Sequence, residues 1–163
     1  MKSKWWKVDK LDTKVEIKGG ELMLYGRYEH TIDAKNRVFI PAKFKDALGS
    51  TFKITYNQLL NQCILIYSES EWASLLEKVK GLSNFQYQFF KRDICSNTVD
   101  VQLDSQGRIV IPQYLKEKAG LSKTALILGI GDHAEIWSPE VLEKKDAEVD
   151  LEELKEQLKN IGF

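Results

Sequence analysis

Residues 32–41 read IDAKNRVFIP and residues 103–112 read LDSQGRIVIP, so the chain carries one pattern twice. The same spacing separates the two aspartates, the two arginines and the two prolines of these stretches. A second match follows each copy at nearly the same distance, IYS at residues 66–68 and IWS at residues 136–138. Self-similarity at one spacing indicates a tandem repeat, in which one supersecondary unit occurs twice.

Both repeats predict the same order of elements. A strand with alternating apolar residues leads into the repeated pattern, and a second strand ends at its proline, which cannot donate a hydrogen bond to a sheet. A short amphipathic segment follows, at residues 42–48 and again at 113–119, and a glycine ends it in each repeat. Two further strands come next in each repeat. We expect them at 52–56 with 63–67, and at 125–130 with 134–137, the latter pair joined by a hairpin turn at Gly131-Asp132-His133.

A helix is expected after each of these strand pairs, at residues 70–80 and from Pro139 onward. Ser70 and Ser138 are the predicted N-caps, because a serine hydroxyl accepts hydrogen bonds from the free N–H groups of a first helical turn. Pro139 suits the first helical position, where no N–H is needed.

The centre of the repeated pattern has the chemistry of a tight turn. Asp33 and Asp104 can each accept the backbone N–H two residues on, which forms an Asx-turn. Gly107 permits a positive φ, and Asn36, at the matching place, is the next most tolerant residue. The two copies thus agree in backbone demand while they differ in sequence, which supports a real turn more strongly than either copy alone.

An arginine follows each turn, Arg37 in the first repeat and Arg108 in the second. We expect these side chains to be exposed on a rigid turn, where a guanidinium can grip a phosphate or bind guanine with two hydrogen bonds. Lys35 adds a second cation in the first copy, and Gln106 replaces it in the second. A single copy of such a pattern would most often be an ordinary polar turn; its repetition favours a binding role.

Composition limits the alternatives. The 163 residues suit one compact domain or two small halves, and the formal net charge is zero. No apolar run approaches the roughly 20 residues of a membrane helix. Cys63 and Cys95 are expected to be free thiols in the core of a protein from a reducing cytosol. His30 and His133 have no partners at metal-ligand spacing, so neither a metal, a cofactor nor a small-molecule substrate is predicted, and an enzyme is disfavoured.

The repeats, taken with their flanking residues, resemble the MraZ family of the SpoVT/AbrB swapped-hairpin superfamily. The resemblance runs from Met23 to about Trp137. It rests on these residues: Met23-Leu24-Tyr25-Gly26, Asp33, Lys35, Arg37, Ile40-Pro41-Ala42-Lys43-Phe44, Glu71-Trp72, Asp104, Gly107-Arg108 and Glu135-Ile136-Trp137. The segment Gln88-Phe89-Phe90-Lys91-Arg92 resembles the family's Arg-x-Phe-x-Arg stretch, but Gln88 departs from its first arginine. Asn36 departs from the glycine that is usual in the family's turn.

This resemblance implies an α+β fold in which two β-hairpin/helix units interleave into a swapped-hairpin, AbrB-like barrel with outer helices. It also implies a cytoplasmic, nucleoid-associated regulator, usually a repressor. Such a regulator binds direct repeats of double-stranded DNA upstream of the division and cell-wall gene cluster that includes its own gene, and it assembles into a ring-like homo-oligomer. By the same resemblance Arg37, Arg108, Lys35 and Lys43 are the expected DNA-binding residues, and Arg27 and Lys45 are weaker candidates.

The expected division of the chain has four parts: an extension at residues 1–22, a first unit at 23–94, a second unit at 95–140, and an acidic helix or tail at 141–163. The pentapeptide KGGEL before Met23 can be encoded as AAA-GGA-GGT-GAA-CTT, which contains a near-ideal bacterial ribosome-binding site. We therefore expect Met23 to be the start and the first 22 residues to be a translated leader; a basic arm that helps to bind DNA is the alternative.

Two questions stay open on the sequence alone. Phe85, Tyr87, Phe89 and Phe90 form a dense aromatic patch, for which burial in a core or subunit interface is favoured over base stacking. The turns could also serve protein contacts in a structural oligomer, or bind RNA in place of duplex DNA. A steep fall of affinity with salt is expected if the partner is a nucleic acid.

Overall fold

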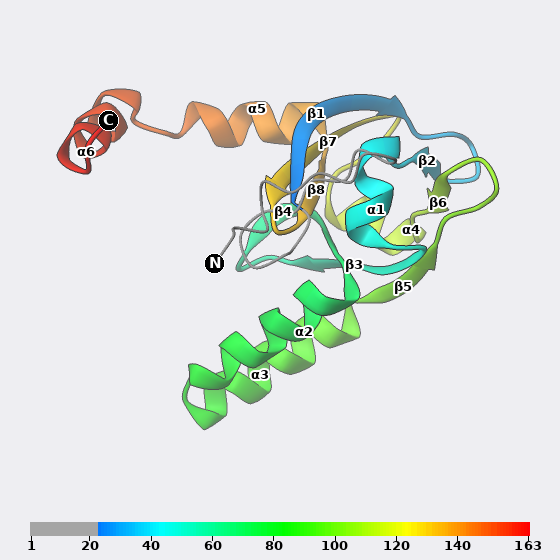
Figure 1. The fold of residues 1–163 in the computed structure, drawn as a ribbon, viewed down its shortest axis with the longest axis horizontal. Helices are drawn as coiled ribbons and strands as arrows, with labels where there is room; N and C mark the ends of the chain where they lie inside the picture. Colours follow the sequence, from blue (N-terminus) through cyan, green and yellow to red (C-terminus); the bar gives the residue numbers. More distant parts are fainter. Residues whose placement is uncertain (1–22) are drawn as a thin grey trace, which may run out of the picture.

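The computed structural model describes residues 23–163, and the expectations for residues 1–22 lie outside this range. The described chain is mixed α+β, as predicted, with antiparallel strands and helices (Figure 1). The first half contains, in chain order, β1 (Leu24–Thr31), β2 (Arg37–Phe39), the 3-10 helix η2 (Ala42–Phe44), α1 (Lys45–Leu48), β3 (Thr51–Asn57), β4 (Asn61–Tyr67), α2 (Glu69–Lys78), the 3-10 helix η3 (Val79–Gly81) and α3 (Asn84–Ser96).

The second half repeats this order up to its first long helix. It contains β5 (Val99–Gln102), β6 (Arg108–Val110), α4 (Gln113–Lys118), β7 (Thr124–Gly131), β8 (Ala134–Trp137), α5 (Pro139–Ala147) and α6 (Leu151–Asn160). The strands predicted from apolar alternation are confirmed to within a few residues at their ends.

Six strands form one antiparallel sheet in the order β1-β7-β8-β4-β3-β5. The strands that lead into the repeated turns pair with the other repeat, β1 with β7 and β5 with β3. β2 and β6, which leave the turns, pair with each other in a separate two-stranded ribbon. This order reads the same when the repeats are exchanged, so the sheet has an approximate twofold axis between β4 and β8. Neither repeat can complete its strand pairing alone.

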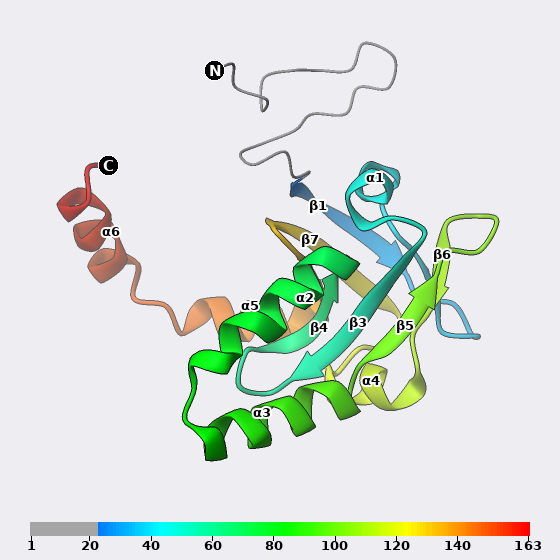
Figure 2. The same ribbon diagram turned by 60° about the horizontal axis from the view of Figure 1, so that its bottom comes forward.

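The sheet separates two apolar clusters. Alternate residues of β4 supply both, because successive side chains of a strand point to opposite faces. Ile64 and Ile66 belong to the cluster beneath the β2–β6 ribbon, whereas Cys63 and Leu65 belong to the cluster that Trp72 of α2 and Leu142 of α5 complete. The ribbon, α1 and α4 therefore cover one face of the sheet, and α2, α3 and α5 cover the other (Figures 1 and 2).

Three details differ from the sequence predictions. Ser70 is not the N-cap of α2: that helix begins at Glu69, directly after β4, and the Oγ of Ser68 accepts the N–H of Glu71. Cys95 is exposed rather than buried, because Phe90 and Ile94 occupy the inner face of α3, a helix that was not predicted. Both cysteines are free thiols, and Ser138 caps α5 as expected.

Candidate nucleic-acid interface

The first turn is held together by the side chain of Asp33. Its Oδ1 accepts hydrogen bonds from the backbone N–H groups of Lys35 and Arg37, each at 2.9 Å. Its Oδ2 accepts the Nε of Arg37 at 2.7 Å. Two backbone hydrogen bonds close the loop, from Asn36 N to Asp33 O at 2.9 Å and from Asp33 N to Arg37 O at 3.0 Å. The predicted Asx-turn is confirmed.

The second turn reproduces this arrangement. The Oδ1 of Asp104 accepts the N–H groups of Gln106 and Arg108 at 2.8 and 2.9 Å, and its Oδ2 accepts the Nε of Arg108 at 2.8 Å. Gly107 N donates to Asp104 O at 3.0 Å. Each aspartate therefore fixes the backbone of its turn and the direction of its arginine with one side chain.

The hydrogen bonds to the backbone change the acidity of both aspartates. The pKa of Asp33 falls from 3.8 to about 2, chiefly because the N–H of Arg37 binds the ionised carboxylate, with further contributions from the Arg37 side chain and the N–H of Lys35. The pKa of Asp104 is lowered in the same way, first by the N–H of Arg108. Both carboxylates are thus anionic at neutral pH and keep the turns closed.

The left-handed position is filled as predicted, with φ of 60° at Asn36 and 85° at Gly107. Asn36 also links its turn to the second repeat: its Nδ2 donates to Gln113 Oε1 and its Oδ1 accepts from Lys116 Nζ, both at 3.0 Å. Lys45 occupies the place of Lys116 in the other repeat, and its Nζ lies where a side chain at position 107 would point. The two turns therefore meet equivalent lysines.

The two arginines share the outer face of the β2–β6 ribbon. Arg37 lies opposite Val110, and Phe39 lies opposite Arg108, while Val38 and Ile109 of the same strands are buried. The ribbon continues past its strands through two backbone hydrogen bonds, from Ile40 N to Gly107 O at 3.0 Å and from Ile111 N to Asn36 O at 2.8 Å. Strand pairing thus brings together two arginines that are far apart in the sequence.

These arginines are less exposed than the sequence predicted. The Arg37 side chain is 31% exposed and the Arg108 side chain is 18% exposed. The aspartate of each turn takes up the Nε, and the Arg108 guanidinium lies 5.8 Å above the ring of Phe39. Within residues 23–163 no hydrogen bond engages the terminal nitrogens of either guanidinium, so these donors remain free for a ligand.

The predicted lysines lie around this ribbon on different elements. Lys35 is exposed in the first turn, and Lys43 is exposed in η2, which follows β2. Lys45 stands near Gly107 of the second turn, whereas Arg27 is exposed on β1 in the large sheet. No hydrogen bond or ion pair in the described part of the chain joins these four residues to the two arginines.

Both turns project from the same end of the molecule. The β1–β2 and β5–β6 connections lie together at one side in Figures 1 and 2, and α6 lies at the other. One ligand can therefore touch both turns and the ribbon between them.

Comparison with known proteins gives this arrangement a family. The family model described as MraZ protein matches the chain twice, at residues 23–89 and 94–160. The chain belongs to the MraZ family. The members of this family that resemble it carry the name transcriptional regulator MraZ, and a transcriptional regulator is not a class of enzyme.

Curated MraZ proteins match over their full length. Transcriptional regulator MraZ of Caldanaerobacter subterraneus subsp. tengcongensis is 42% identical over 145 residues, which are 86% of this chain and 100% of the relative. The protein of the same name from Thermoanaerobacter pseudethanolicus is 41% identical with the same coverage. That of Clostridium tetani is 38% identical over 144 residues. The family resemblance predicted from the repeated turns is therefore confirmed.

One residue of this candidate interface, Phe39, was not predicted from the sequence. The sequence alone suggested no role for Phe39, which lies on the opposite face of its strand from the buried Val38. It is 43% exposed on the ribbon, between Arg108 and His30, whose ring centroid lies 6.1 Å from that of Phe39. An aromatic residue on an exposed strand flanked by arginines is the signal that could have identified it.

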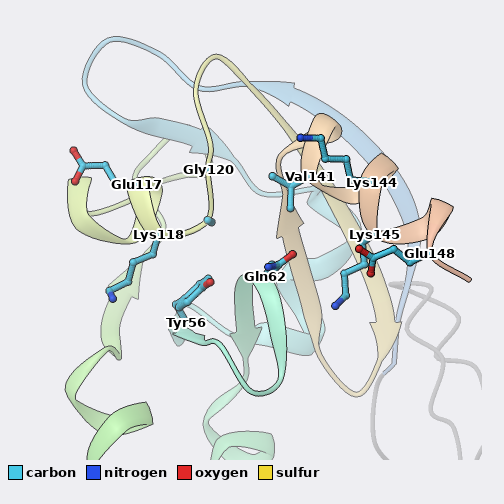
Figure 3. Close-up of a pocket in the computed structure, with 10 residues that line it drawn as sticks. Tyr56, Gln62, Glu117, Lys118, Gly120, Val141, Lys144, Lys145 and Glu148 are labelled. Carbon is cyan, nitrogen blue, oxygen red and sulfur yellow. The ribbon is translucent and has the colours of Figure 1, made fainter.

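A separate cavity of about 310 Å³ lies between α4, α5 and the β3–β4 hairpin (Figure 3). Tyr56 and Gln62 line it together with lysines and glutamates, among them Lys118 and Lys145. Figure 3 shows that the charged ends point in different directions and do not converge on one point. None of its lining residues belongs to the turns or the ribbon.

Residues 23–163 contain no cluster of three His, Cys, Asp or Glu side chains placed to hold a metal ion. None of the helices in this range is long and apolar enough to cross a membrane.

Proposed function

We propose that this chain regulates transcription by binding double-stranded DNA through the β2–β6 ribbon and its two turns. The observation that carries the proposal is the pair of arginines on one exposed face, each oriented by a fixed aspartate. An oriented guanidinium loses less conformational freedom on binding, and its free terminal nitrogens match a phosphate or the O6 and N7 atoms of guanine.

The shape and surroundings of the ribbon support the same proposal. A two-stranded ribbon fits the major groove of B-form DNA, where base edges can be read. Lys35 and Lys43 would contact phosphates beside it, and Arg27 and Lys45 would add weaker contacts. Phe39 offers an apolar surface to a thymine methyl group. In this proposal Asp33, Asn36, Asp104 and Gly107 bind no DNA; they shape the turns.

The wider function follows from the family resemblance. We propose that the interleaved repeats form the swapped-hairpin, AbrB-like barrel, with the boundary between the two units at residues 94 and 95. Several such chains would form a ring-like homo-oligomer. Such an assembly would bind direct repeats upstream of its own gene and usually repress the division and cell-wall gene cluster, at the nucleoid in the cytoplasm. Repeated DNA sites would then match repeated ribbons, and multivalency would raise a modest single-site affinity.

Fluorescence anisotropy with a labelled duplex from the region upstream of the gene tests the proposal. We expect the full chain to bind tightly and with steep salt dependence, because phosphate contacts release counterions. The variant Arg37→Ala/Arg108→Ala should lose about 10-fold to 1000-fold in affinity if each arginine contributes as a base or phosphate contact does. The matched control Lys155→Ala/Lys159→Ala removes the same charge from α6 and should bind like the parent chain on a duplex with a single repeat.

The competing use of the ribbon for protein contacts makes a different prediction. In that case Arg37→Ala/Arg108→Ala would change the oligomeric mass, measured by light scattering, and would leave any DNA affinity unchanged. Higher affinity for RNA than for duplex DNA of the same sequence would favour the RNA-binding alternative. A salt-independent affinity would contradict nucleic-acid binding of either kind.

A further inference from the structure

α6 has an apolar stripe that the elements of residues 23–163 leave uncovered. The stripe consists of residues at spacings of three and four, which fall on one face of a helix: Leu151, Leu154, Leu158 and Ile161. All four are exposed, and Leu151 is 69% exposed. Asp150 caps the helix through the N–H groups of Glu152 and Glu153, so its start is well defined.

A helix of this length needs a packing partner. Helices shorter than about 12–15 residues are marginal in water, and most of their stability in proteins comes from burial of an apolar face. α6 lies beyond α5, and a connection of residues 148–150 joins the two helices. In both views it stands apart from the sheet and from the α2–α3 hairpin (Figures 1 and 2). No element of residues 23–163 therefore serves as its packing partner.

The same chain exposes an apolar groove of about 590 Å³ between the β3–β4 turn and the α2–α3 hairpin. Its most exposed apolar lining residues are Leu59, Leu60, Leu82, Phe85 and Phe89, and Phe85 is 82% exposed. Phe90 closes its floor, so the aromatic patch is only partly in the core. Monomeric proteins rarely expose apolar side chains in such a contiguous group unless a partner covers them.

We propose that α6 of one copy docks into the α2–α3 groove of the next copy. The proposal rests on the self-association included in the proposed function and names the contact that would produce it. Amphipathic helices bind apolar grooves through side chains at i, i+3 and i+7, which is the spacing of Leu151, Leu154 and Leu158. One contact would cover both exposed apolar surfaces.

Charge favours the same pairing. Among residues 23–163, Lys78 is the one charged residue that lines the groove, and no acidic side chain of this range lines it. From Asp150 to Asn160 the α6 segment carries more acidic than basic residues. A helix with acidic excess thus meets a groove edged by a cation, whereas two α6 helices packed together would bring like charges close and leave the groove uncovered.

The contact is head-to-tail, because the helix and the groove are different surfaces of one chain. Such a contact leaves one free helix and one free groove on every dimer, so it continues until a ring closes. DNA binding stays at the opposite end of each subunit, where the two turns project (Figure 1). The contact would therefore hold ribbons in a repeated array without covering them.

Two variants test the contact by light scattering at a fixed protein concentration. Leu154→Glu places a charge on the apolar stripe of α6, and Phe85→Glu places in the groove a charge that repels the acidic helix; both sites are exposed, so the fold should survive. We expect each variant alone to be monomeric, while the parent chain forms the oligomer. A 1:1 mixture should form dimers and nothing larger, because the intact α6 of the groove variant can occupy the intact groove of the helix variant.

Other outcomes would overturn the proposal. If Phe85→Glu kept the parent mass while Leu154→Glu lost it, α6 would pair with something other than the groove, such as another α6. If both variants kept the parent mass, or if their mixture stayed monomeric, the contact would be absent. Glu156→Ala, on the polar side of α6, is the matched control and should keep the parent mass.

DNA binding is a separate readout in this experiment. Both monomeric variants should bind a duplex with a single repeat as the parent chain does, and should lose the added affinity for a duplex with several repeats. If the proposed DNA binding is wrong, no form of the protein binds the duplex. The masses would still decide whether α6 occupies the groove.

Discussion

Asn36 and Gly107 show how two residues meet one backbone demand. Both adopt a positive φ, but only Asn36 has a side chain to receive Lys116, and Lys45 stands at the equivalent place without an acceptor. Both repeats share the backbone conformation at this position of the turn. The side-chain hydrogen bonds at this position are made only by Asn36, in the first repeat, because Gly107 has no side chain.

Substitution of Gly107 tests this equivalence. A Cβ at Gly107 would lie 3.2 Å from Lys45 Nζ, the flexible end of a side chain that can move. We expect Gly107→Asn to change the free energy of unfolding by less than about 1 kcal/mol, since asparagine tolerates this conformation and Lys45 can donate to it. Gly107→Val should be destabilised by at least about 1–2 kcal/mol, because a β-branched residue resists positive φ. Urea denaturation measures both, and equal losses would contradict the argument.

The aspartates give the turns a dependence on pH. The folded pKa of Asp33, about 2, lies below its ordinary value of 3.8. A depressed pKa adds stability that is present above the ordinary value and is lost as the pH falls toward 2. We expect the urea midpoint to fall between pH 4 and pH 2, and to fall less in Asp33→Asn/Asp104→Asn, whose amides do not titrate. A variant with an unchanged pH profile would show that these carboxylates are not the cause.

At the scale of elements, two serines near the start of α2 have different roles. Ser68 accepts the N–H of Glu71, whereas Ser70 lies inside the helix, where its hydroxyl is 3.3 Å from that of Ser68. We expect Ser68→Ala to lower the free energy of unfolding by about 1 kcal/mol, the usual effect of losing a cap. Ser70→Ala should stay within about 0.5 kcal/mol, as surface substitutions do. Thermal unfolding of the two variants checks the difference. A larger loss of stability in Ser70→Ala than in Ser68→Ala would indicate that Ser70 is the cap.

The sequence predicted the elements better than their partners. Apolar alternation placed the strands, and the Asp and Gly/Asn positions placed the turns, because these signals are local. Local patterns carry less information about which strands pair across the molecule. The meeting of Arg37 and Arg108 on one ribbon, and the stacking of Arg108 on Phe39, therefore needed the structure. The helix at Asn84–Ser96 was not predicted, because its phenylalanines lie on its exposed side as well as its buried side and so weaken the amphipathic pattern of the sequence.

At the scale of the whole molecule, the approximate twofold symmetry of the fold is not matched by its chemistry. The backbones of the two turns agree closely, but the position of Lys35 in the first repeat is occupied by Gln106 in the second, and that of Phe39 by Val110. Arg37 is also more exposed than Arg108. If the ribbon binds DNA, its two ends present different charges, so a single chain would bind a site that has a direction, which suits direct repeats better than palindromes.

The difference in charge between the two turns can be removed by one substitution. Gln106 is exposed in the second turn at the place of Lys35, and only its backbone N–H takes part in the turn. We expect Gln106→Lys to keep the turn and to add one phosphate contact, so that affinity rises at low salt and the slope of log affinity against log salt steepens by about 1. Lys35→Gln should have the opposite effect, since it removes the equivalent contact. Anisotropy titrations over a range of salt concentrations measure both slopes. If neither slope moved, the turns would lie away from the phosphates, and the ribbon alone would have to account for any binding.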